Sequence, residues 1–114
     1  MTIQECYEKM GADYNGILER LGTQAMVERF AVKFLNDASY ASLMEALEQK
    51  DYENAFRAVH TLKGVAANLS LTHVQETASE LTEELRGGKP LVHPELVQNL
   101  TDAYQEAIST LKEF

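Results

Sequence analysis

Apolar residues recur every three or four positions along almost the entire chain, which is the spacing of residues on one face of an α-helix. No segment shows the sustained alternation of apolar and polar residues that is typical of a strand with one exposed face. The last three helical segments are long and their connectors are short, which favours antiparallel packing of neighbours. The pattern therefore predicts an all-α protein: an antiparallel four-helix bundle with additional short N-terminal helices.

The two short helices are expected within residues 1–22. Thr2 and Glu5 have the spacing of a capping box at the start of the first helix, and Gly11 interrupts that helix. Cys6 is the only cysteine, so an internal disulfide is excluded. We expect its side chain to pack as a small apolar group of the first helix.

Residues 23–114 are predicted to form the bundle itself. Together with the N-terminal helical extension of residues 1–22 they make a single domain, because a chain of 114 residues has the usual size of one domain. The expected signals for helix starts and stops are Ser39 as a cap, Asp51 as the start of a longer segment, Thr72 with Gln75 as a capping box, Gly87 and Gly88 as a stop, and Pro94 in a first turn. The glycine pair lacks the flanking pattern of a phosphate-binding loop, so we interpret it as a helix stop.

The chain is acidic, with 18 Asp and Glu against 10 Lys and Arg and a formal net charge of −8. This charge repels a phosphate backbone, so nucleic acid is not an expected partner. No continuous apolar segment reaches the length of a signal peptide or of a membrane span, so we expect a cytoplasmic protein with no membrane partner. The chain has no nucleotide-binding motif and no residues with metal-ligand spacing.

The segment of residues 51–70 has the clearest helical phase. Its apolar face is formed by Tyr52, Ala55, Val59, Leu62, Ala66 and Leu69. His60 points roughly 130° away from the centre of that face, so its imidazole is expected at the surface. Neighbouring turns place four further residues close to the direction of His60: Phe56, Lys63, Gly64 and Ala67.

Two residues of this strip need an explanation. Gly64 lies in the middle of a helix, where glycine costs about 0.5–1 kcal/mol relative to alanine. The missing side chain would let another protein approach His60 closely. Lys63 places a cation within reach of anything bound to the imidazole, and it would give a phosphoryl group a charge-assisted hydrogen bond.

A histidine at such a position can act as a nucleophile. An imidazole ordinarily titrates near pH 6.5, so at cytoplasmic pH it is largely neutral and one nitrogen has a free lone pair. A phosphorylated ring nitrogen is also a good leaving group. The site needs little further machinery if the partner protein supplies a metal ion and acidic groups.

The residues from His60 to Asn68, with the sequence HTLKGVAAN, resemble the signature of histidine phosphotransfer (HPt) domains, His-x-Leu-Lys-Gly followed by small residues. The resemblance extends over nearly the whole chain and is weakest before Asp13. It includes Phe30, Leu47, Asp51, Ala55, Ala58 and the returning segment from Leu81 to Gly87. One departure is Ser70, where many members of the family have glycine, so the turn after this helix is expected to differ.

The resemblance implies a carrier in a two-component phosphorelay that moves a phosphoryl group between His60 and aspartates of receiver domains. His60 would be the phosphoacceptor, Lys63 would support the phosphoryl group, and Phe56, Gly64 and Ala67 would contact the partner. The implied partners are the receiver domain of a response regulator and a sensor or hybrid histidine kinase. No intrinsic cofactor is implied, and Mg²⁺ is expected on the receiver domain during transfer.

Other interpretations remain open. The chain could be a helical adaptor that binds a receiver or kinase domain without phosphorylation. A self-sufficient kinase has no support, because no nucleotide-binding motif is present. We interpret His73 and His93 as surface or helix-start residues, and Glu80, Glu83 and Glu84 as a solvated helix face.

Overall fold

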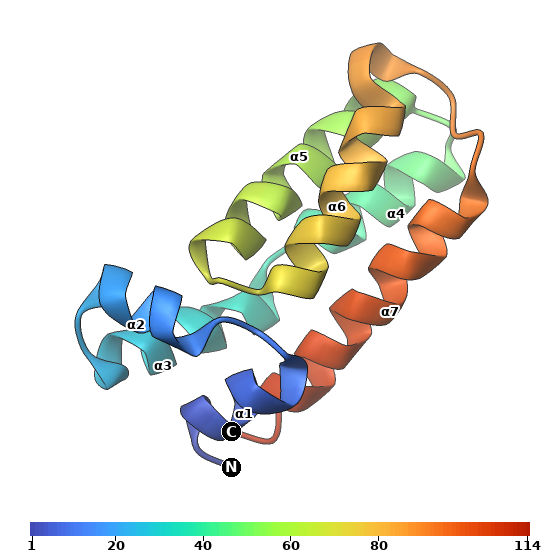
Figure 1. Ribbon diagram of the computed structural model, residues 1–114. Helices are drawn as coiled ribbons and strands as arrows, with labels where there is room; N and C mark the ends of the chain where they lie inside the picture. Colours follow the sequence, from blue (N-terminus) through green and yellow to red (C-terminus); the bar gives the residue numbers. More distant parts are fainter.

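The computed structural model describes all 114 residues and is built only of helices (Figure 1). The α-helices are α1 (Ile3–Met10), α2 (Tyr14–Leu21), α3 (Gln24–Lys33), α4 (Ser39–Glu48), α5 (Tyr52–Asn68), α6 (Thr72–Leu85) and α7 (Pro94–Leu111). Two 3₁₀ turns, η1 (Phe34–Asn36) and η2 (Arg86–Gly88), follow α3 and α6. The prediction of an all-α fold is confirmed.

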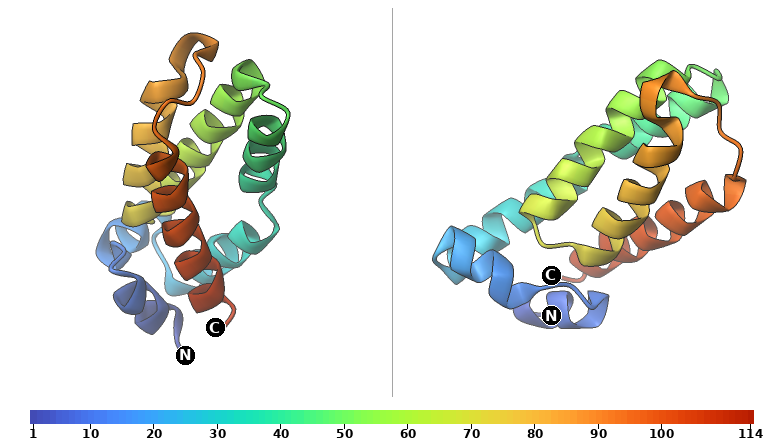
Figure 2. Two further views of the ribbon diagram at one scale, coloured as in Figure 1. Left: turned by 90° about the vertical axis from the view of Figure 1, so that its right-hand side faces the viewer. Right: turned by 45° about the horizontal axis from the view of Figure 1, so that its top comes forward.

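Helices α4, α5, α6 and α7 run in alternate directions and form the predicted antiparallel bundle (Figures 1 and 2). The long α5 packs between α4 and α6, and α7 packs on α6. Tyr40 of α4 meets α7 directly: its ring centroid lies 4.0 Å from that of Tyr104, and its hydroxyl lies 2.8 Å from that of Thr101. These contacts join the first and last helices of the bundle.

Several predicted helix signals are confirmed. Thr2 and Glu5 form both hydrogen bonds of a capping box at the start of α1. The Asp51 carboxylate accepts a hydrogen bond from the backbone N–H of Asn54 at the start of α5. This N–H group is one of those in the first turn that have no partner within the helix. Pro94 occupies the first turn of α7.

Two predicted caps are wrong. Ser39 is already the first residue of α4, and its backbone N–H donates 2.9 Å to the Asp37 carboxylate. Thr72 is already the first residue of α6, and its hydroxyl donates to the carbonyl of Ser70. Both helices therefore begin one residue earlier than predicted. An oxygen in the preceding turn accepts a hydrogen bond from the residue that was expected to provide the cap.

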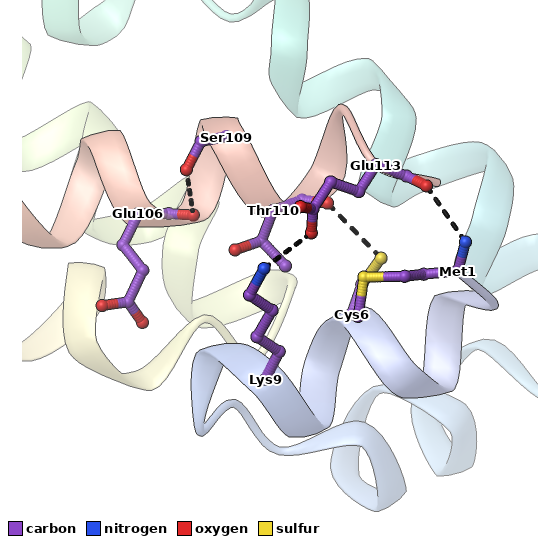
Figure 3. Close-up of polar contacts among 7 residues, drawn as sticks. All are labelled: Met1, Cys6, Lys9, Glu106, Ser109, Thr110 and Glu113. Carbon is purple, nitrogen blue, oxygen red and sulfur yellow. Dashed lines mark hydrogen bonds and ion pairs between the residues drawn. The ribbon is translucent and has the colours of Figure 1, made fainter.

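The N-terminal helices share the core of the bundle. Ile3, Cys6 and Tyr7 of α1 are fully buried in the same apolar cluster as the inner face of α5, which confirms the expected burial of Cys6. Figure 3 shows α1 against the end of α7, where the Cys6 thiol donates to the carbonyl of Thr110 at 3.5 Å. A salt bridge between Lys9 and Glu113 joins the same two regions at 2.8 Å.

The N-terminal helices also bind the end of α5. Ser70 lies just past this end and has a left-handed backbone conformation, with a φ of +56°. The guanidinium of Arg20 on α2 donates to the carbonyls of Ala67 and Asn68 at 3.1 and 2.9 Å, and to the Ser70 hydroxyl. The Tyr7 hydroxyl donates to the carbonyl of Leu69. Because the last carbonyls of a helix have no partner within it, these donors stabilise the end of α5.

Candidate functional site

Helix α5 presents two opposite faces. Its inner face consists of Ala55, Val59, Leu62, Ala66 and Leu69, which are all buried, together with the half-buried Tyr52. The side chain of His60 is exposed on the outer side. The helical phase inferred from the sequence is therefore confirmed, and it determines which side chains accompany His60.

The imidazole of His60 lies against the ring of Phe56, one turn earlier. The two ring centroids are 5.8 Å apart and the planes differ by 13°, which is a stacked arrangement. Phe56 is half-buried and packs on the core, so it gives the imidazole a fixed apolar support. Neither ring nitrogen of His60 has a hydrogen-bond partner within the chain, so both are free for an incoming group.

Gly64 leaves open space beside His60. The residue is exposed, and a Cβ atom added to it would meet no neighbouring atom within 4 Å. Packing within the bundle therefore does not require glycine here. No contact within the bundle explains why the helix has glycine here despite its free-energy cost. This favours the interpretation that another molecule approaches closely at Gly64.

Lys63 is half-buried on α5, which packs against α6. It forms no salt bridge within the chain. Across the helix pair, hydrogen bonds from Arg86 hold the pKa of Glu83 below its usual range, and the charge of Lys63 lowers that pKa further. The charge of the Lys63 ammonium therefore influences the Glu83 carboxylate without a salt bridge between the two groups.

The structure brings the predicted site residues together on one face. Phe56, His60, Lys63, Gly64 and the half-buried Ala67 occupy consecutive turns of α5. Their proposed chemical roles rest on this arrangement and on the sequence signature, and they stay predictions.

Two arginines near this face were not predicted. Arg86, from the turn after α6, places its guanidinium carbon 5.4 Å from the centroid of the Phe56 ring. Arg20 of α2 binds the carbonyl of Ala67 at the other end of the strip. Both contacts join different helices, so the periodicity of α5 gave no signal for them.

The interpretation of Glu84 as part of a solvated helix face is wrong. Its half-buried carboxylate accepts the backbone N–H groups of Val92 and His93 at 3.0 and 2.9 Å and lies against the imidazole Nδ1 of His93. Because the chain turns back after α6, a residue on that helix reaches the start of α7. Glu84 therefore ties the connection between the two helices.

The remaining sequence interpretations concern residues away from His60. His73 is exposed in the first turn of α6, and His93 directly precedes α7. Gly87 and Gly88 have φ values of +77° and +76°, which glycine adopts readily, so the helix stop is confirmed.

No three His, Cys, Asp or Glu side chains gather in a metal-binding arrangement. None of the helices combines the length and the apolar character needed to cross a bilayer.

Comparison with known families gives one match. The model of a family described as "Hpt domain" matches residues 35–112, which is more than half of the chain and includes α4 to α7. Searches of curated proteins and of solved structures find no match. Hpt domains are helical bundles associated with histidine phosphotransfer in two-component systems, and they are phosphoryl carriers rather than catalysts. The match of this family model to residues 35–112 shows that the chain belongs to the Hpt domain family.

Proposed function

We propose that this protein carries a phosphoryl group on His60 between proteins of a two-component phosphorelay. The observation that supports this most directly is the accessibility of the His60 imidazole. It is exposed, both of its nitrogens lack hydrogen-bond partners in the chain, and the space over Gly64 beside it is open. Attack on a phosphoryl group of another protein requires an accessible imidazole with a free nitrogen lone pair.

The transfer step needs one nucleophile from this chain. A lone pair on a neutral imidazole nitrogen attacks the phosphorus of an aspartyl phosphate on the receiver domain. The N–P bond forms as the bond from phosphorus to the aspartate oxygen breaks, and the aspartate leaves as a carboxylate. The reverse reaction passes the phosphoryl group to another receiver. Lys63 donates a charge-assisted hydrogen bond to the phosphoryl oxygens.

The rest of the machinery belongs to the partners. We expect the receiver domain to bind Mg²⁺ and to supply the acidic groups, and a sensor or hybrid histidine kinase to provide the phosphoryl group at the start of the relay. This chain would therefore have no kinase activity of its own and no intrinsic cofactor. A cytoplasmic location stays a prediction.

Labelling with a phosphorylated receiver domain tests the proposal. The wild-type protein should gain an acid-labile phosphoryl label from the receiver, and ATP with Mg²⁺ alone should leave it unlabelled. The variant His60→Gln should take no label while it keeps the helical circular dichroism spectrum of the wild type. A wild-type protein that binds the receiver but never takes label would instead be the phosphorylation-independent adaptor.

A further inference from the structure

The ring of Phe56 is contacted from two directions. On α5 the imidazole of His60 stacks on it, with 5.8 Å between the centroids. From the turn after α6, the guanidinium of Arg86 lies 5.4 Å from its centroid. A residue of another helix thus reaches the same ring that supports the histidine.

Arg86 is held firmly for an exposed side chain. Its Nε and Nη2 atoms donate to the two oxygens of Glu83 at 2.8 and 3.0 Å, which is a bidentate pair. An arginine in such a pair keeps its planar group in one orientation, so it can lie against an aromatic ring at little further entropic cost. Glu83 therefore determines where the guanidinium meets Phe56.

A fixed Phe56 ring limits the motion of His60. A solvent-exposed histidine ordinarily samples several staggered rotamers. Stacking on a ring that is itself held from both the core and Arg86 favours one of them. When the reactive group is already oriented, less conformational freedom is lost on the way to the transition state, and transfer is faster.

We propose that Arg86, anchored by Glu83, is a positioning residue for His60 and acts through the ring of Phe56. This inference rests on the proposed function of His60, because the orientation of the imidazole matters only if the imidazole reacts. It assigns a role in phosphotransfer to a residue outside α5 that forms no hydrogen bond with the imidazole.

Arg57 offers a matched control. It also forms an exposed salt bridge to a carboxylate on its own helix, Glu53, at 3.1 Å. Unlike Arg86, it makes no cation–π contact with Phe56. Replacing either arginine by glutamine removes one positive charge near the N-terminal half of α5, whereas a contact with the Phe56 ring is lost only in Arg86→Gln.

The experiment compares the full-length wild type, Arg86→Gln and Arg57→Gln. In the unphosphorylated proteins, NMR measures the displacement of the His60 imidazole proton shifts by the Phe56 ring current. Single-turnover transfer from a phosphorylated receiver is then measured over a range of receiver concentrations. Such a titration separates the rate at saturation from the half-saturating concentration.

We expect Arg86→Gln to reduce the ring-current displacement and to lower the saturating rate roughly two- to five-fold. This factor corresponds to the free energy of an exposed cation–π contact. The half-saturating concentration should change less than the saturating rate, because Phe56, Gly64 and Ala67 are all retained. Arg57→Gln should resemble the wild type in both measurements.

Two results would overturn the proposal. One is an Arg86→Gln protein with unchanged imidazole shifts and an unchanged saturating rate. The other is an equal loss in Arg57→Gln, which would show a general effect of charge. A wild-type protein that takes no label would refute the proposed function instead, and the imidazole shifts would then still decide whether Arg86 orients the ring.

Discussion

His60 and His93 both lie at the surface of the bundle, but their surroundings differ in nearly every respect. The imidazole of His93 lies against the carboxylate of Glu84, which also accepts the backbone N–H of the same residue. Hydrogen bonding to this carboxylate and its negative charge raise the pKa of His93. The imidazole of His60 stacks on the ring of Phe56 and has no hydrogen-bond partner within the chain.

The comparison shows what makes a histidine available for chemistry. At His93 one ring nitrogen is engaged, and the neighbouring carboxylate favours the protonated ring, which has no lone pair for attack. At His60 no side chain in the bundle hydrogen-bonds to either nitrogen. The protein thus uses one histidine to hold a connection between helices, and we propose that it reserves the other for a partner.

The largest expected effect separates the two histidines directly. His60→Gln should lose all labelling by a phosphorylated receiver, whereas His93→Gln should keep the labelling of the wild type. The measurement is acid-labile label per folded molecule, with folding checked by circular dichroism. Undiminished labelling of His60→Gln, or its loss in His93→Gln, would reverse the assignment.

A smaller effect is expected at the cation beside His60. Lys63→Ala should slow transfer or shorten the lifetime of the phosphohistidine roughly ten-fold or more without abolishing labelling, because one charge-assisted hydrogen bond contributes about 1.5–3 kcal/mol. Lys89→Ala is a suitable control, since Lys89 is an exposed lysine beyond the end of η2. An equal effect of the two substitutions would mean that Lys63 acts only through the net charge.

The surface over Gly64 should respond to size. Gly64→Gln should weaken receiver binding several-fold and slow transfer more than Gly64→Ala, because its side chain would fill the approach path one turn from His60. Gly64→Ala should raise the stability of the fold by about 0.5–1 kcal/mol, since alanine favours the helix and the added Cβ meets open space. Thermal melts and receiver titrations measure both quantities. Lowered melting temperatures with unchanged receiver affinity would make Gly64 a structural residue.

The contact between His93 and Glu84 should appear in the pH dependence of stability. The backbone and side-chain hydrogen bonds of His93 lower the pKa of Glu84 from 4.5, so its contribution is present above pH 4.5 and is lost as pH falls through the lowered value. The pKa of His93 is raised from 6.5, so its contribution is full below pH 6.5 and is lost as pH rises through the raised value. The pair therefore contributes most between these two values.

Glu84→Gln tests this window. The difference in melting temperature between the wild type and this variant should be larger at about pH 5.5 than at about pH 8.5. Glu80→Gln removes an exposed carboxylate one turn earlier on the same helix and should show no such difference. A difference for Glu84→Gln that does not change with pH would leave its carboxylate with only a capping role.

The sequence predicted the features that depend on position along one helix. On α5 the spacing of Val59, Leu62 and Ala66 determines the buried face, so the exposure of His60 and its neighbours followed from it. The contact of His60 with Phe56 also lies within one helix, at the spacing of one turn. For these features the geometry of a regular helix was sufficient.

The features that were missed depend on where the chain turns. The contact of Glu84 with His93 forms across the connection between α6 and α7, and the contact of Arg86 with Phe56 joins two helices. Ser70 was expected to alter the turn after α5, but neither its left-handed conformation nor the pairing of its hydroxyl with the distant Arg20 was predicted. Helical periodicity contains no information about such pairs, because it does not specify how neighbouring helices are rotated against one another.

The contact between α1 and the end of α7 has a consequence for the order of folding. Helices α4, α5 and α6 pack on their sequence neighbours, whereas Cys6 meets Thr110 across nearly the whole chain. Contacts of long sequence separation close large loops, so α1 is expected to dock after the bundle has formed and to detach before it unfolds. Cys6 is the only thiol and is fully buried, so the rate at which a thiol reagent modifies it would measure how often this helix opens.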